Sequence, residues 1–146
     1  MESLEEAVRI ALSWELEARD NYLRWSKEAN EPNVKRLFFN LHRMEEWHVR
    51  LLEGLDFKGD AKVSSGTVWL DLSHGMTSYP TSSDRRLRGV FEYAISKEEA
   101  SNSRYQRMAE ALPAGKTRDF FLALASEEKY HRTLLIEQYT RLLRPY

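Results

Sequence analysis

The sequence predicts an all-α protein, a four-helix bundle of two antiparallel helix hairpins joined by a long crossover loop. Three observations support this fold class. Apolar residues recur at helical spacing in four long stretches. The second pair of stretches repeats the pattern of the first pair 83 residues further along the chain. The connections within the pairs are short, which makes the two helices of each pair antiparallel neighbours.

The first hairpin is expected over residues 3–54. Its first helix begins at Ser3, a good N-cap residue, and ends near Asn30. Pro32 suits the first turn of the second helix, and Gly54 is the expected C-cap. Trp14, Trp25 and Trp47 are expected to serve in packing and not in binding a cofactor, and Met44 falls in the predicted buried stripe of the second helix.

Residues 55–83 are expected to form the crossover. Gly, Pro, Ser and Thr residues interrupt any helical pattern there, and residues 67–72 could form a short extended segment. A loop of this length needs a structural reason. If the second and third helices run parallel, the connection must travel the length of the bundle, which is roughly 37 Å for helices of about 25 residues.

The second hairpin is expected over residues 84–143. Its first helix runs to about Leu112, where Pro113 and Gly115 end it. The second helix runs from about Lys116 to Leu143. Met108 is expected in the core. With 146 residues, the chain is most simply one domain, 1–146.

Composition excludes several classes of protein. The hydrophobic content of 42% and charged content of 31% are typical of a soluble helical protein. A net charge of −1 offers no general attraction to nucleic acid or to an acidic membrane surface. We see no signal peptide or transmembrane segment and expect a cytoplasmic protein. The absence of cysteine excludes disulfides, thiolate-bound zinc and Cys-ligated iron–sulfur clusters.

Acidic and imidazole side chains interrupt the apolar stripes at matching positions. Each half contributes one glutamate from its first helix and a Glu-x-x-His pair from its second helix, and an i, i+3 pair lies on one helical face. An unpaired carboxylate in a dry core costs on the order of several kcal/mol, so a compensating group is needed. The six candidates are Glu15, Glu45, His48, Glu98, Glu128 and His131.

Four carboxylates and two imidazoles suit two divalent metal ions, whose charges balance those of the carboxylates. Mixed oxygen and nitrogen ligands favour iron or manganese, with zinc as a further option. The alternative is a bundle with buried Glu–His hydrogen bonds and no metal. A single Glu-x-x-His is weak evidence, as the pair Asp71 and His74 illustrates, because that pair has the spacing but lies in the crossover.

Two tyrosines stand seven residues after the lone glutamates. Tyr22 follows Glu15 and Tyr105 follows Glu98, two helical turns along the same face. Two readings of these tyrosines are open: they fill the core, or their hydroxyls support a ligand carboxylate by hydrogen bonding.

At these positions the chain resembles the ferritin-like di-iron carboxylate superfamily, and within it the rubrerythrin-like branch. The resemblance is carried by the segments 15–22, 45–48, 94–105 and 124–131. It implies a ferritin-like bundle with a di-metal site, most often iron. It also implies that Glu45 and Glu128 bridge the ions and that the other four candidates are terminal ligands.

The chain departs from the family pattern in three respects. It has no cysteines for a rubredoxin module, so an external electron-donor protein is expected. Ser101 stands where peroxidase-type rubrerythrins carry a further glutamate, so a plain six-ligand site is expected. Few residues follow Leu143, which leaves no room for the fifth helix of ferritin cages.

Three functions follow from these expectations. The first is a redox enzyme that reduces peroxide or O₂, or oxidises ferrous iron, at a di-iron site. The second is a non-catalytic metal-binding or iron-handling bundle. The third is a docking or dimerisation module with a structural metal. We also expect a homodimer, and the long crossover would permit the hairpins to exchange between subunits.

Overall fold

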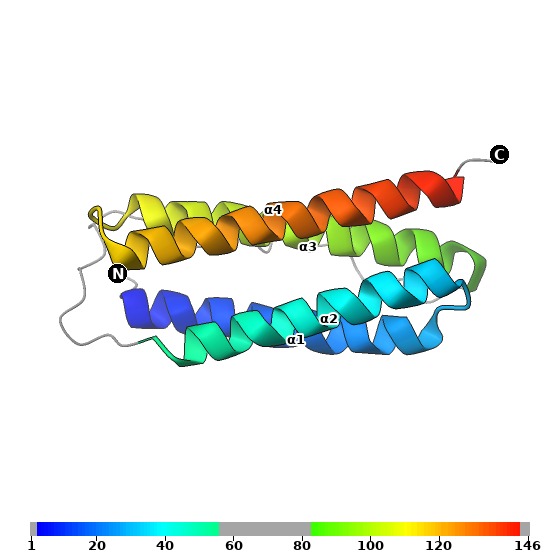
Figure 1. Cartoon of the computed structure of the whole chain (residues 1–146), viewed down its shortest axis with the longest axis horizontal. Coiled ribbons are helices and arrows are strands. Elements are labelled where there is room, and N and C mark those ends of the chain that lie inside the picture. Colours follow the sequence, from blue (N-terminus) through cyan, green and yellow to red (C-terminus); the bar gives the residue numbers. More distant parts are fainter. Residues whose placement is uncertain (1–2, 56–82, 144–146) are drawn as a thin grey trace.

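A computed structural model contains the whole chain and describes residues 3–55 and 83–143. These residues form four helices and so confirm the predicted all-α bundle (Figure 1). The predicted crossover, 55–83, lies almost entirely outside the described residues, as do Asp71 and His74. The helices are α1 (Leu4–Glu28), α2 (Pro32–Glu53), α3 (Ser83–Glu110) and α4 (Lys116–Leu143).

Local sequence signals explain where the first two helices begin and end. The Ser3 side chain accepts a hydrogen bond from the Glu6 backbone while the Glu6 carboxylate accepts one from Ser3, which completes a capping box. Helix α2 has Pro32 in its first turn, and the Glu31 carboxylate caps it. Gly54 is its C-cap, as predicted. The first hairpin therefore lies where the sequence predicts it.

The two hairpins pack side by side to form the bundle. Helix α1 lies along α2 and α3 lies along α4, while the hairpins meet where α1 faces α3 and α2 faces α4. Figure 1 shows that α2 and α3 run in the same direction, so that α2 ends at one end of the bundle and α3 begins at the other. This parallel arrangement is the one that requires a long crossover.

The apolar core is divided into two clusters, one towards each end of the bundle. One cluster includes Val8, Leu52, Met108 and Phe121, and the other includes Trp25, Phe38, Phe91 and Leu135. The glutamates and histidines of the predicted site lie between them in the sequence of each helix. The site is therefore enclosed along the bundle axis by apolar side chains at both ends.

Two of the residues expected to take part in packing are exposed. Trp47 retains 56% of its accessible surface and Met44 retains 37%. Trp25 and Met108 are buried as predicted, whereas Trp14 is half-buried. The error at Trp47 and Met44 arises because both lie beside the buried stripe of α2, where helical spacing alone does not define the edge of the core. Within the described residues, no helix is long and apolar enough to cross a membrane.

Candidate metal centre

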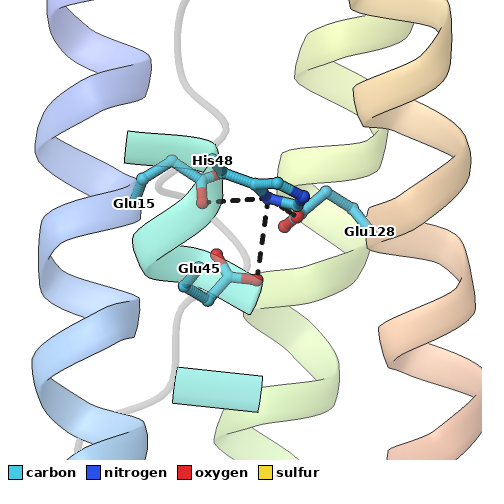
Figure 2. Close-up of side chains that lie close together, drawn as sticks. All are labelled: Glu15, Glu45, His48 and Glu128. Atoms are coloured by element: carbon cyan, nitrogen blue, oxygen red, sulfur yellow. Dashed lines mark ion pairs between the residues drawn. The ribbon is translucent and has the colours of Figure 1, made fainter. Parts of the chain in front are cut away.

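All six predicted ligands come together at the middle of the bundle. Each helix contributes, and each of the six side chains keeps at most 2% of its accessible surface. Figure 2 shows four of them, Glu15, Glu45, His48 and Glu128, converging from α1, α2 and α4. Helical spacing explains this convergence, because residues three or four apart on a helix share a face.

The six side chains form two overlapping groups. Glu15, Glu45, His48 and Glu128 offer ligand atoms within 4.8 Å of one another, and so do Glu45, Glu98, Glu128 and His131. Glu45 and Glu128 belong to both groups. Each group contains three carboxylates and one imidazole, so each has the donor set of one metal position, and the shared pair lies where bridging ligands are needed.

The two imidazoles direct the same nitrogen into the cluster. His48 Nδ1 lies 2.9 Å from Glu128 Oε1 and 3.3 Å from Glu15 Oε2. His131 Nδ1 lies 2.8 Å from Glu45 Oε1 and 2.9 Å from Glu98 Oε2. The rings are almost parallel, with an interplanar angle of 11° and centroids 5.5 Å apart. Both Nδ1 atoms therefore face carboxylates of the other hairpin or of the opposite helix.

These short distances do not have the angles of hydrogen bonds. Among the described residues, the buried side-chain atoms without a hydrogen-bond partner include both Nδ1 atoms, both oxygens of Glu45 and of Glu128, Glu15 Oε2 and Glu98 Oε2. Buried polar atoms are rarely left unsatisfied. Here the unsatisfied atoms gather in two groups, with the ligand atoms of each group within 4.8 Å of one another, an arrangement that a bound cation would satisfy. The residues present fit a pair of divalent metal ions.

Electrostatics lead to the same conclusion. Burial raises the pKa of Glu45, Glu98 and Glu128 well above the usual carboxyl value, and repulsion from neighbouring carboxylates raises it further. Burial also tends to raise the pKa of Glu15, but its close contacts with the Glu45 and His48 side chains outweigh burial and leave the pKa lowered. Without a cation the cluster therefore retains protons, which metal ions would displace.

The two histidines differ in their environment. Burial lowers the pKa of both, but the hydrogen bond with Glu127 and the close contact with Glu128 outweigh burial at His48 and raise its pKa to about 12. His131 has no comparable gain, and its pKa is lowered, first by burial. The two halves of the site are thus alike in their ligands and unlike in their surroundings.

The tyrosines hold carboxylates of the opposite hairpin. The Tyr105 hydroxyl donates to Glu15 Oε1 at 2.8 Å, and a hydrogen bond from Tyr22 lowers the pKa of Glu98. Burial and the nearby carboxylates raise the pKa of both tyrosines well above the usual value, so both keep the proton that they donate. Both tyrosines are also part of the apolar core clusters. They therefore fill the core and also hydrogen-bond carboxylates of the candidate site.

Sequence reasoning missed Glu127, which contacts the outer side of the site. Its Oε1 lies 3.2 Å from His48 Nε2, the nitrogen that faces away from the cluster. Glu127 keeps 48% of its side-chain surface and so looks like an ordinary surface acid in the sequence. The sequence feature that could have indicated this contact is the position of Glu127 next to Glu128, because a side chain at that position can reach His48 on α2.

Sequence reasoning also missed two buried cations on α3. Lys97 Nζ lies 4.8 Å from the centre of the Trp14 ring and 3.6 Å from Glu17. Arg104 is buried and lies 5.7 Å from the same ring. Long side chains can bury their apolar stems while the charged end keeps a partner, so apolar periodicity does not reveal them. These residues fill the α1–α3 seam beside the site.

Comparison with known protein families agrees with the geometry. The family model for rubrerythrin matches residues 90–144. The second hairpin is therefore similar to rubrerythrin. The matched region covers most of α3 and all of α4, including Glu98, Glu128 and His131. Helices α1 and α2 lie outside the matched region. Their candidate ligands Glu15, Glu45 and His48 are identified by the 83-residue repeat and by the geometry of the site. No curated protein and no solved structure gave a significant match.

Proposed function

We propose that this protein binds two divalent metal ions, with iron as the working pair, and uses them to reduce peroxide or O₂ or to oxidise ferrous iron. The observation that carries the proposal is the set of buried, unpartnered oxygen and nitrogen atoms that converge in two overlapping groups. The rubrerythrin match to the second hairpin supports the redox assignment.

Each residue has a defined part in this proposal. Glu45 and Glu128, which belong to both groups, would be shared between the two ions. Glu15 and His48 complete one metal position, and Glu98 and His131 complete the other. Carboxylates shared between two positions keep the ions close enough to act together on one substrate. A bound iron pair supplies the capacity to exchange two electrons with an oxygen–oxygen bond or to accept electrons from ferrous iron.

The rest of the chain keeps the centre ordered and dry. The apolar clusters exclude water along the bundle axis, which strengthens electrostatic interactions inside the site. Tyr105 and Tyr22 fix the orientation of Glu15 and Glu98 through their hydroxyls. We include an electron-donor protein in the proposal, since reduction of peroxide or O₂ consumes electrons and the 146 residues contain no cysteine that could hold a rubredoxin-type centre.

Reoxidation of the ferrous protein tests the redox function. The protein is loaded anaerobically with two equivalents of ferrous iron and then mixed with peroxide or with O₂ while ferric absorption is recorded. We expect reoxidation faster than that of the same iron in buffer. If neither oxidant reoxidises bound iron faster than free iron, the enzyme assignment is wrong, and tight binding alone would then indicate a metal-binding protein.

Substitution of a bridging ligand tests the site itself. Glu128→Ala removes a carboxylate from both groups, so at least one ion should be lost from the protein when metal content is measured by elemental analysis. Glu99→Ala is the matched control, because this neighbour of Glu98 is exposed and outside both groups. Retention of two ions by Glu128→Ala would contradict the assignment.

A further inference from the structure

The two halves of the site differ at Glu127, a position outside the six candidate ligands. Glu127 on α4 contacts His48 on α2 through Oε1 and Nε2, at 3.2 Å. The 83-residue repeat that relates all six ligands places Met44 at the position equivalent to Glu127. A thioether is a weak hydrogen-bond acceptor and carries no charge. The carboxylate that supports His48 therefore has no acidic counterpart at the equivalent position of the first hairpin.

The contact has the geometry of a support for a metal ligand. His48 is fully buried, its Nδ1 faces Glu15 and Glu128, and its Nε2 faces Glu127. When Nε2 donates its proton to a carboxylate, the lone pair of the ring must lie on Nδ1, the atom inside the cluster. The same hydrogen bond fixes the ring orientation and increases its basicity as a ligand, effects that are commonly worth about 10- to 100-fold in metal affinity.

We propose that Glu127 is a positioning residue that makes the two metal positions unequal, so that the position containing His48 binds its ion more tightly and fills first. This inference rests on the proposed two-metal function. Glu127 acts through His48 and contacts no ion itself. Its partial exposure leaves it in contact with solvent at the outer side of the bundle, whereas the histidine that it orients is enclosed.

Stepwise metal titration tests this proposal. Metal-free protein is titrated with Co²⁺, and binding is followed by calorimetry and by the visible absorption of the bound ion. Wild-type protein should bind two ions with separable affinities. Glu127→Ala should weaken the tighter step by about 10- to 100-fold and bring the two steps together. Glu127→Gln keeps an acceptor oxygen without the charge, so it should restore part of the difference.

Two further variants separate the proposed role from a general loss of charge or of folding. Glu46→Ala is the control, because Glu46 is an exposed acid on α2 next to a bridging glutamate. It should leave both affinities unchanged. Met44→Glu introduces the missing carboxylate at the equivalent position and should strengthen the weaker step. Proton NMR of the Co²⁺ protein gives a direct readout: one shifted, slowly exchanging imidazole N–H should be lost in Glu127→Ala and retained in Glu127→Gln.

The possible outcomes distinguish this inference from the function on which it rests. A wild-type protein that does not bind two ions would overturn both. Two ions with affinities that change less than about twofold in Glu127→Ala, and an unchanged N–H signal, would overturn the role of Glu127 alone. A loss confined to the tighter step, with Glu46→Ala unchanged, supports it.

Discussion

At the scale of single residues, several buried polar atoms of the candidate metal centre lack hydrogen-bond partners. Ion pairs with histidine within 4 Å are common, but here the Nδ1 atoms have no hydrogen bond of acceptable geometry despite carboxylate oxygens at 2.8–2.9 Å. Hydrogen-bonded Glu–His pairs, the metal-free alternative, would direct these atoms at one another. The arrangement of the described residues favours a bound cation over that alternative.

Removal of the Tyr105 hydroxyl tests whether a hydrogen bond to a candidate ligand carboxylate contributes to metal binding. Tyr105→Phe deletes the donor to Glu15 Oε1 and preserves the ring in the core. The Tyr105 hydrogen bond helps to lower the pKa of Glu15, so the variant should raise that pKa. We expect metal affinity to fall by about tenfold, the smallest effect that is usual when a group supporting a metal ligand is removed. The measurement is the same Co²⁺ titration, at two pH values.

The matched control for this variant is Tyr139→Phe. Tyr139 donates to the exposed Glu92, away from the site, and its loss should leave metal affinity unchanged. Equal affinities for Tyr105→Phe and wild-type protein would show that the hydroxyl only fills space.

At the scale of helices, the exposed apolar side chains are unevenly distributed. Within the described residues, all the large apolar side chains that are exposed lie on α2 and α4. They are Phe39, Met44, Trp47, Leu122 and Tyr130. Helices α2 and α4 contact each other where the two hairpins meet. Large apolar side chains exposed on two adjacent helices are candidates for an interaction surface. We therefore propose that the expected homodimer forms through α2 and α4.

Sedimentation analysis of surface variants tests this interface. Trp47→Glu places a charge at the exposed Trp47 position of α2, and a buried unpaired charge is costly, so dimer association should weaken at least tenfold in favour of monomer. Gln106→Glu adds the same charge to the exposed face of α3 and should leave association unchanged. A wild-type monomer across the concentration range, or equal association in both variants, would rule this surface out.

At the scale of the whole molecule, periodicity explains which features could be predicted. The helices and the convergence of all six candidate ligands follow from apolar stripes that are interrupted at matching positions, because a buried charged residue needs a physical reason. Glu127, Lys97 and Arg104 escaped prediction because a charged residue beside a stripe is usually solvated, and only the neighbouring helix shows otherwise. The prediction for Trp47 was wrong for the opposite reason. Its hydrophobicity favours burial, but it lies on the outward-facing side of α2.

The pH dependence of stability is set by the whole cluster of buried glutamates and histidines. In metal-free protein, Glu45, Glu98 and Glu128 have folded pKa values well above the ordinary 4.5, so above pH 4.5 the folded state binds more protons than the unfolded state. Stability must then fall as pH rises through the folded pKa values. The raised pKa of His48 acts in the same direction above 6.5, while the lowered pKa of His131 opposes it.

We therefore expect the Tm of chelator-treated protein to fall between pH 5 and pH 8, as measured by circular dichroism. Bound metal replaces the protons, so the stabilisation that metal provides should increase over the same range. Glu45→Gln removes one of the repelling carboxyl groups and should flatten the decline, whereas Glu46→Gln, at the exposed neighbouring position, should not. A metal-free Tm that rises across this window would mean that the carboxyl groups are compensated without a cation, and the metal centre itself would then be in question.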